Sequence, residues 1–149
     1  MKEWRISEAL LPAAWQDLAP VVPVPAVYID HVMPALSDAE WRVLCIVIRQ
    51  TLGWIDTKKH SSRKQRDWIS HSQFKARTGK SSDAISRAID GLVQVGLLII
   101  EREDGRLMSH PHARRRAHCR LYYRLGLLPN SVQQEGSVQQ DEATIQEDC

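Results

Sequence analysis

Apolar residues recur at helical spacing in the segment that follows Ser37. Four of them occupy positions i, i+3, i+4 and i+7, which lie on one face of an α-helix: Trp41, Leu44, Cys45 and Ile48. The segment opens with S-D-A-E, a capping box in which the serine oxygen and the glutamate carboxylate satisfy free backbone N–H groups. The pattern predicts a first buried helix that begins at this box and stops at Gly53, after Leu52.

Two further helices are predicted after residue 70, with a glycine between them. Ser70 is placed to cap a short helix over residues 71–77, and a second serine, Ser81 or Ser82, to cap a longer one that ends near residue 95. Gly79 predicts the tight break between the two helices. One side of the longer helix is apolar: Ile85, Ala88, Ile89, Leu92 and Val95.

Two short runs near the end of this region predict β-strands. Residues 97–100 are apolar, and residues 120–125 read R-L-Y-Y-R-L, which is rich in aromatic residues. Asp104 and Gly105 between the runs are a strong turn signal. The two strands are therefore expected to form a β-hairpin, whereas the polar, basic stretch 57–66 predicts a loop.

The two ends of the chain differ in composition from its middle. Residues 1–35 contain five prolines and predict an extended, partly helical N-terminal arm, with residues 21–29 as an extended strap on the core. Residues 129–149 are polar, acidic and of low complexity, which predicts a disordered acidic tail. Since 149 residues have room for one ordinary core, residues 36–128 are expected to form a single domain.

The order of these elements is typical of a winged helix-turn-helix, a mainly α fold with a small β-hairpin called the wing. The second helix of the pair fits the major groove of DNA, where each base pair presents its own pattern of donors and acceptors. The wing and flanking basic residues contact phosphates. We therefore expect sequence-specific binding to double-stranded DNA, with residues 81–95 as the recognition helix and residues 36–128 as the DNA-binding domain.

Arg87 is the strongest candidate for reading a base. It lies opposite the apolar side of the predicted recognition helix, and a guanidinium can donate two hydrogen bonds to a guanine edge. The alternative is a solvated arginine that pairs with Asp83 or Asp90 on the same helix. Further DNA contacts are expected from Ser86 and from the start of the helix, where free N–H groups favour a phosphate: Lys80, Ser81 and Ser82.

Basic residues are concentrated in two stretches, although the formal net charge is only +2. Residues 57–80 contain eight basic residues and one acid, and residues 102–124 contain seven arginines and two acids. Contiguous arginines at the tip of the wing are expected to contact phosphate or the minor groove, and the basic loop is a second candidate. In both places solvated surface charge is the alternative. The candidates are Arg114, Arg115 and Arg116 in the wing, and Arg63 and Lys64 in the loop.

No other chemistry is indicated. The three cysteines are far apart and lack a C-x-x-C spacing, so neither a disulfide framework nor a zinc site is expected. We expect no catalytic site, no bound metal and no cofactor, and we expect Trp54 and Trp68 in the core rather than as platforms for bases. The chain has no run of 18 apolar residues and no secretory signal pattern, which predicts a cytoplasmic protein without a membrane span.

Parts of the sequence also resemble a known family. Residues 36–44 read L-S-D-A-E-W-R-V-L, and residues 48–54 read I-R-Q-T-L-G-W. With the helix-turn-helix segments 69–74 and 78–89, they resemble the N-terminal domain of phage replication protein O, the lambda-type replication initiator, from residue 24 to residue 100. The resemblance implies binding to repeated sites at a replication origin, usually as a homodimer, and recruitment of the replicative helicase or its loader.

Two other functions stay open. A winged-helix transcription regulator uses the same scaffold on an inverted repeat near a promoter. A protein-interaction adaptor has lost DNA binding and uses its tail to dock a replication partner. Clustered direct repeats in the encoding DNA favour the initiator, and a palindrome that overlaps the promoter favours the regulator.

Overall fold

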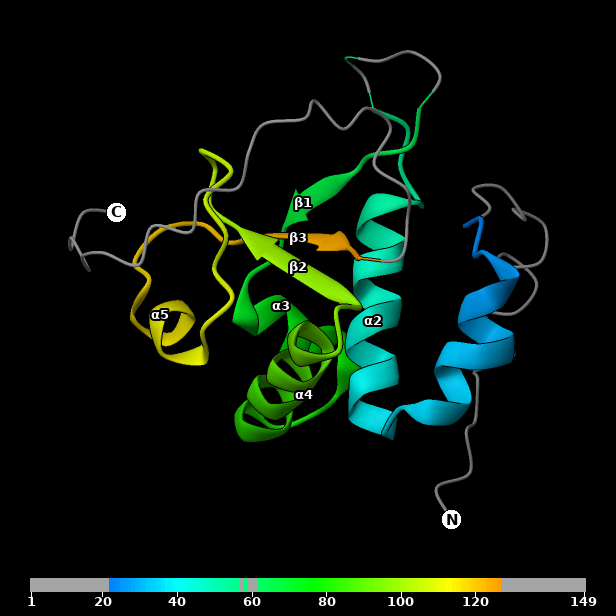
Figure 1. Ribbon diagram of the computed structural model, residues 1–149, viewed down its shortest axis with the longest axis horizontal. Helices are drawn as coiled ribbons and strands as arrows, with labels where there is room; N and C mark the ends of the chain where they lie inside the picture. The colour runs from blue at the N-terminus through cyan, green and yellow to red at the C-terminus, as the bar shows by residue number, and fades with distance from the viewer. Residues whose placement is uncertain (1–21, 57, 59–61, 127–149) are drawn as a thin grey trace, which may run out of the picture.

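The computed structural model describes residues 22–56, 58 and 62–126. Within these residues the protein is mixed α/β, with helices packed against a small three-stranded antiparallel sheet (Figure 1). The predicted tail from residue 129 and most of the predicted N-terminal arm lie outside the described residues. The elements are, in chain order, η1 (Tyr28–Val32), η2 (Met33–Ala35), α2 (Asp38–Thr51), β1 (Arg66–Trp68), α3 (His71–Thr78), α4 (Ser82–Gln94), β2 (Leu98–Glu101), α5 (Pro111–Arg116) and β3 (Tyr122–Leu125).

The first predicted helix is confirmed as α2, with both bonds of its capping box formed. The Ser37 N–H donates to Glu40 Oε1 over 3.0 Å, and the Glu40 N–H donates to Ser37 Oγ over 3.2 Å. The fully buried face is displaced slightly from the predicted stripe, because Val43 and Val47 are buried and Cys45 is only half-buried. The helix ends as predicted, since a side chain at Gly53 would place its Cβ 2.3 Å from the Arg49 carbonyl oxygen.

The pair of helices after residue 70 is also confirmed. Ser70 and Gln73 form a second capping box at the start of α3, and Gly79 ends the helix with a φ of +70°, a conformation that favours glycine. Ser81 caps α4 by accepting a hydrogen bond from the Ala84 N–H over 3.2 Å. The first four of the five residues on the predicted apolar side are buried, but Val95 is 65% exposed because it follows the last turn of α4.

The sheet contains one strand that the sequence did not predict. β2 and β3 pair in antiparallel fashion as expected, and β3 pairs on its other edge with β1, which gives the order β1-β3-β2. β1 begins at Arg66, the last residue of the predicted loop, and it was not predicted as a strand because three residues, R-D-W, carry no alternating pattern. Pairing of side chains across the sheet stabilises it: Arg66 donates to the Glu101 carboxylate over 2.8 Å and covers the Tyr122 ring.

The connection between β2 and β3 is more elaborate than the predicted hairpin. The expected turn at Asp104 and Gly105 is present, closed by a 2.9 Å hydrogen bond from the Arg102 N–H to the Arg106 carbonyl. The chain then returns along β2 through a single bridge at Leu107 and forms the short helix α5 before β3 begins. The contiguous arginines therefore lie on a helix beside α4 and not at the tip of a wing (Figure 1).

The expected strap over residues 21–29 is wrong from residue 26 onward, where the chain is helical. The prolines begin helical turns here: the Tyr28 N–H donates to the Pro25 carbonyl over 3.0 Å, and Pro34 stands in the first turn of η2. Tyr28 and Val32 are buried in the same core as α2 and α4. The packed unit thus includes residues before 36, the boundary expected from composition.

Candidate nucleic-acid interface

The outer face of α4 is accessible to solvent, and α4 lies at the edge of the molecule (Figure 1). The opposite side of the helix is buried against α2 and β2. We use the name outer face for five exposed or half-exposed side chains: Ser82, Asp83, Ser86, Arg87 and Asp90. The apolar pattern of the sequence, which predicts the buried side of this helix, leaves these five residues on the exposed side.

Arg87 stands in the outer face without an ion pair among the described residues. Its Nε donates a long hydrogen bond of 3.4 Å to the main-chain oxygen of Asp83, and not to a carboxylate. The paired arrangement with Asp83 or Asp90 that was the alternative for this arginine is therefore absent from the described part of the chain. Since its guanidinium Nη atoms make no described hydrogen bond, they are free to donate to a ligand.

The start of α4 is more occupied by internal contacts than the sequence suggested. Ser81 is used as the helix cap, and the Ser82 hydroxyl lies 2.9 Å from His71 Nε2 at the start of α3. Lys80 turns toward α2, where its Nζ lies 2.6 Å from Asp38 Oδ2. Of these predicted phosphate contacts, Ser82 is exposed on the outer face, whereas the Lys80 ammonium is directed to a carboxylate.

The Lys80 ion pair belongs to a small network that fixes the α3–α4 turn to α2. Arg42 donates to Asp38 over 3.2 Å and to the Thr78 carbonyl at the end of α3 over 2.8 Å. The hydrogen bond from Lys80, followed by that from Arg42, holds the pKa of the Asp38 carboxyl below its usual value. The orientation of α4 relative to α2 is therefore set by polar contacts as well as by the core.

Arg114 has to be removed from the candidate DNA contacts. Its side chain is only 6% exposed, and one guanidinium nitrogen donates to the carbonyls of Met108 and Ser109 over 2.9 and 2.6 Å. The other nitrogen lies 2.5 Å from Asp90 Oδ1 on α4. A buried charge is stable only when it is paired and hydrogen-bonded, and these contacts satisfy that requirement. Arg114 is thus a structural residue that attaches α5 to α4.

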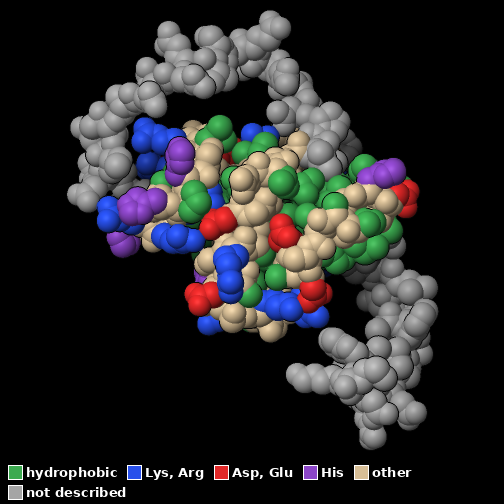
Figure 2. Space-filling model, turned by 60° about the horizontal axis from the view of Figure 1, so that its bottom comes forward, with side chains coloured by type: hydrophobic (Ala, Val, Ile, Leu, Met, Phe, Trp, Pro, Cys, Tyr) green, Lys and Arg blue, Asp and Glu red, His purple; other side chains and the backbone are tan. Residues whose placement is uncertain are grey.

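The other two arginines of α5 remain at the surface. Arg115 is 61% exposed and donates to Asp90 Oδ2 over 2.9 Å, so one carboxylate receives two guanidinium groups. Arg116 is exposed. Basic and histidine side chains gather on the side of the molecule where α5 lies (Figure 2). The helix therefore adds positive charge beside the outer face of α4.

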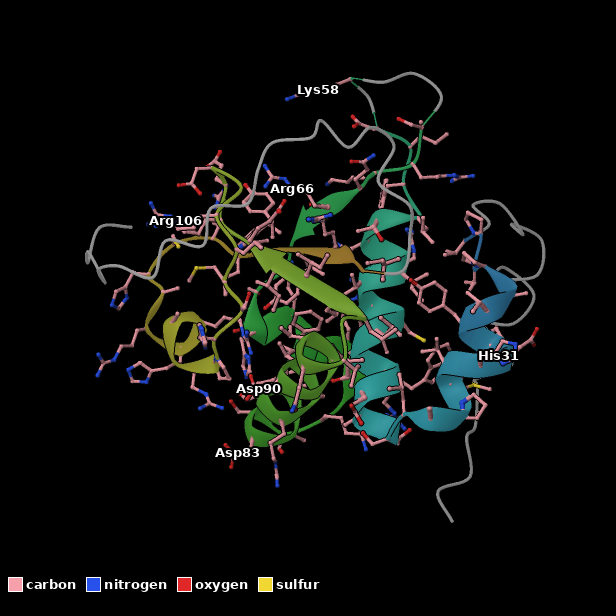
Figure 3. All side chains as sticks on the ribbon, in the orientation of Figure 1. His31, Lys58, Arg66, Asp83, Asp90 and Arg106 are labelled. Atoms are coloured by element: carbon pink, nitrogen blue, oxygen red, sulfur yellow. The ribbon has the colours of Figure 1, made fainter. Side chains whose placement is uncertain are left out.

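The basic loop is at a different end of the molecule. Arg63 is exposed, and the Lys64 ammonium lies 2.5 Å from Asp67. The loop lies near the C-terminal end of α2, where the Lys64 N–H donates to the Trp54 carbonyl. The start of α4 instead contacts the N-terminal end of α2, through the ion pair between Lys80 and Asp38. A helix of 14 residues is about 20 Å long. Lys58 in this loop and Asp83 in the outer face lie at opposite ends of the molecule (Figure 3), and Arg63 and Lys64 are thus separated from the outer face.

Two tryptophans that were expected in the core are partly exposed, each beneath an arginine. Trp54 is 52% exposed with the Arg49 guanidinium 5.0 Å from its ring centre, and Trp68 is 38% exposed with Arg120 at 4.8 Å. Cation–π contacts of this kind cover an aromatic face without burying it. Sequence spacing carried no sign of the contact at Trp68, because its arginine partner is far away along the chain.

A hollow of about 400 Å³ lies between α4, α5 and β1. Its lining combines apolar side chains from the sheet with polar groups from three helices, among them His71 of α3, Ser86 of α4 and Arg115 of α5. No group of three or more His, Cys, Asp or Glu residues in the described parts of the chain is placed to hold a metal ion. None of the described helices is long and apolar enough to span a membrane.

Comparisons of the chain with protein-family models, with curated proteins and with solved structures find no match.

Proposed function

We propose that the protein is a winged helix-turn-helix that binds double-stranded DNA in a sequence-specific manner. The observation that carries the proposal is the pairing of a solvent-facing helix with a second basic helix at its side: α4 presents Arg87, and α5 presents Arg115 and Arg116. An α-helix fits the major groove, and flanking cations contact the phosphates beside it.

The arrangement of elements supports the same proposal. The chain runs from helix α2 through β1 to α3, a three-residue turn and α4, and ends in β2 and β3. The α3–α4 turn is fixed to α2 by the network around Asp38, so α4 is held rigidly in its exposed position. A rigid reading helix loses little conformational freedom on binding, which favours affinity.

The charge of the outer face is compatible with a polyanion despite its two acids. The Asp90 carboxylate is shared by Arg114 and Arg115, so this position carries net positive charge. Asp83 lies in the first turn of α4, where an acid is favoured by the helix dipole. Base reading is thereby assigned to Arg87 and Ser86.

The biological role that we propose is binding at repeated origin sites during initiation of phage or mobile-element DNA replication. This role, together with homodimer formation and contact with a helicase or its loader, rests on the resemblance of residues 36–54 to the replication protein O family. A transcription regulator that binds an operator is the alternative. Both roles require the same DNA-binding face and differ in the arrangement of their sites.

Selection of bound sequences from a pool of random duplexes tests the proposed DNA binding. The wild-type protein is expected to enrich a defined motif, and Arg87→Ala to relax one position of it, with a loss of about 1–3 kcal/mol of discrimination there. Arg63→Ala, a matched arginine at the other end of the molecule, is expected to leave the motif unchanged. Absence of any duplex affinity at low salt contradicts the proposal and favours the adaptor.

The arrangement of the selected motif in the encoding DNA then separates the two roles. Clustered direct copies support an initiator, whereas a single inverted pair that overlaps a promoter supports a regulator. A gel-shift titration on duplexes with one, two or four copies shows whether the protein fills direct repeats.

A further inference from the structure

Asp90 is an acid in the middle of a surface that we propose to meet a polyanion. It lies on the side of α4 that faces α5, whereas Asp83 lies near the start of α4 (Figure 3). Asp90 Oδ1 accepts from Arg114 over 2.5 Å, and Asp90 Oδ2 accepts from Arg115 over 2.9 Å. The Asp83 carboxylate makes no ion pair among the described residues.

The Arg114 side of this contact fixes the position of α5. Arg114 donates to two main-chain carbonyls just before α5 and to Asp90, and it is almost completely buried. Because an arginine remains charged at any physiological pH, removal of its carboxylate partner leaves a buried charge without compensation. α5 has only six residues, and its N-cap residue His110 makes no side-chain cap hydrogen bond, so the helix depends on contacts with other parts of the chain.

The Arg115 side of the contact has a different consequence, because this guanidinium is exposed. Held by one nitrogen on Asp90, Arg115 lines the hollow between α4 and α5 together with Ser86 of the outer face. Its position next to α4 is therefore fixed before any ligand arrives. Its remaining N–H groups are available for a phosphate oxygen, which an arginine can bind through two parallel hydrogen bonds.

We infer that Asp90 is a positioning residue for DNA binding: it fixes α5 against α4 so that Arg115 contacts the phosphate strand that borders the groove read by α4. This inference rests on the proposed function. By positioning Arg115, Asp90 raises the affinity for DNA, although a carboxylate by itself repels phosphates and lowers affinity.

Positioning of Arg115 raises affinity and negative charge lowers it, so a matched pair of variants can separate the two effects. Asp83→Asn and Asp90→Asn each remove one acid from the same helix. If charge alone matters, both variants bind a duplex more tightly than the wild type. If Asp90 positions Arg115, Asp83→Asn tightens binding, whereas Asp90→Asn weakens it about tenfold, the size expected when one charge-assisted hydrogen bond is removed.

The measurement is fluorescence anisotropy of a labelled duplex, carrying the selected motif, titrated with the full chain at several salt concentrations. Asp90→Asn is expected to lower the slope of log affinity against log salt by about 0.9, the value for one phosphate that is no longer neutralised. Asp90→Glu keeps a carboxylate and is expected to recover most of the affinity. Arg115→Ala is expected to weaken wild-type binding but to add little in the Asp90→Asn background.

Tighter or unchanged binding by Asp90→Asn overturns the inference while the proposed function stands. Arg115 is exposed, so Arg115→Ala tests the inference even if Asp90→Asn does not fold: wild-type affinity in this variant overturns it. Absence of binding by the wild-type protein overturns the inference and the proposed function together.

Discussion

Tyr28 is the largest fully buried side chain of the described residues, and its environment is unusual for a hydroxyl. The hydroxyl has no hydrogen-bond partner within the described part of the chain. Burial raises the pKa of the phenol to about 12, because the low-dielectric interior disfavours the phenolate. The ring contributes to the core, whereas the hydroxyl carries the cost of lost hydration.

The substitution Tyr28→Phe is therefore expected to increase the free energy of unfolding by about 1 kcal/mol at neutral pH, measured by urea denaturation. Because the pKa of Tyr28 is raised in the folded state, the unfolded chain loses the phenol proton first, and the free energy of unfolding of the wild type falls as pH rises from 10 to about 12. The variant lacks this titration, so its free energy of unfolding falls less. Tyr123, whose pKa is also raised to about 12 by burial, remains in both proteins. Lower stability of Tyr28→Phe at neutral pH contradicts this description.

The three consecutive arginines of α5 have different environments, although they are neighbours in the sequence. Arg114 is buried and bonded to Asp90, Arg115 is exposed and shares the same carboxylate, and Arg116 is exposed. The sequence shows only a basic run. Which member is buried depends on the face that α5 turns toward α4, and this is decided by contacts 24 and 25 residues away along the chain.

At the scale of elements, the helices that begin and end at local sequence signals were predicted correctly. The elements that depend on contacts distant in the sequence were not predicted. Both capping boxes, the Ser81 cap and Gly79 act within four residues, so α2, α3 and α4 could be predicted from sequence alone. β1 has three residues and forms because β3 pairs with it, and α5 is held by Arg114, so neither has a local signal. In the candidate site, the outer face of α4 could be predicted, whereas the contact between α4 and α5 could not.

The attachment of α5 leads to a prediction at this scale. Arg114→Ala is expected to lower the free energy of unfolding by about 2–3 kcal/mol, because it removes three hydrogen bonds from a charged group and leaves Asp90 with Arg115 alone. Arg116→Ala, its exposed neighbour, is expected to change stability by less than about 0.5 kcal/mol. Thermal unfolding of both variants is the measurement, and equal effects contradict the structural role of Arg114.

At the scale of the whole molecule, the basic residues predicted as DNA contacts belong to two separate regions. One comprises α4, its start and α5, and the other is the loop that follows α2. Both regions were predicted as DNA contacts, because the sequence shows how charge is distributed along the chain but not where the segments lie in the folded protein. Under the proposed function, the separation along α2 places Arg115 and Arg116, but not Arg63 and Lys64, beside a duplex that lies along α4.

The most direct test of the proposed interface is the salt dependence of duplex binding in two variants with equal loss of charge. We predict that Arg115→Ala/Arg116→Ala lowers the slope of log affinity against log salt by about 0.9 for each phosphate that the variant no longer binds, whereas Arg63→Ala/Lys64→Ala leaves the slope unchanged. Equal changes in both variants, or a larger change in the loop variant, would contradict the assignment of DNA binding to α4 and α5.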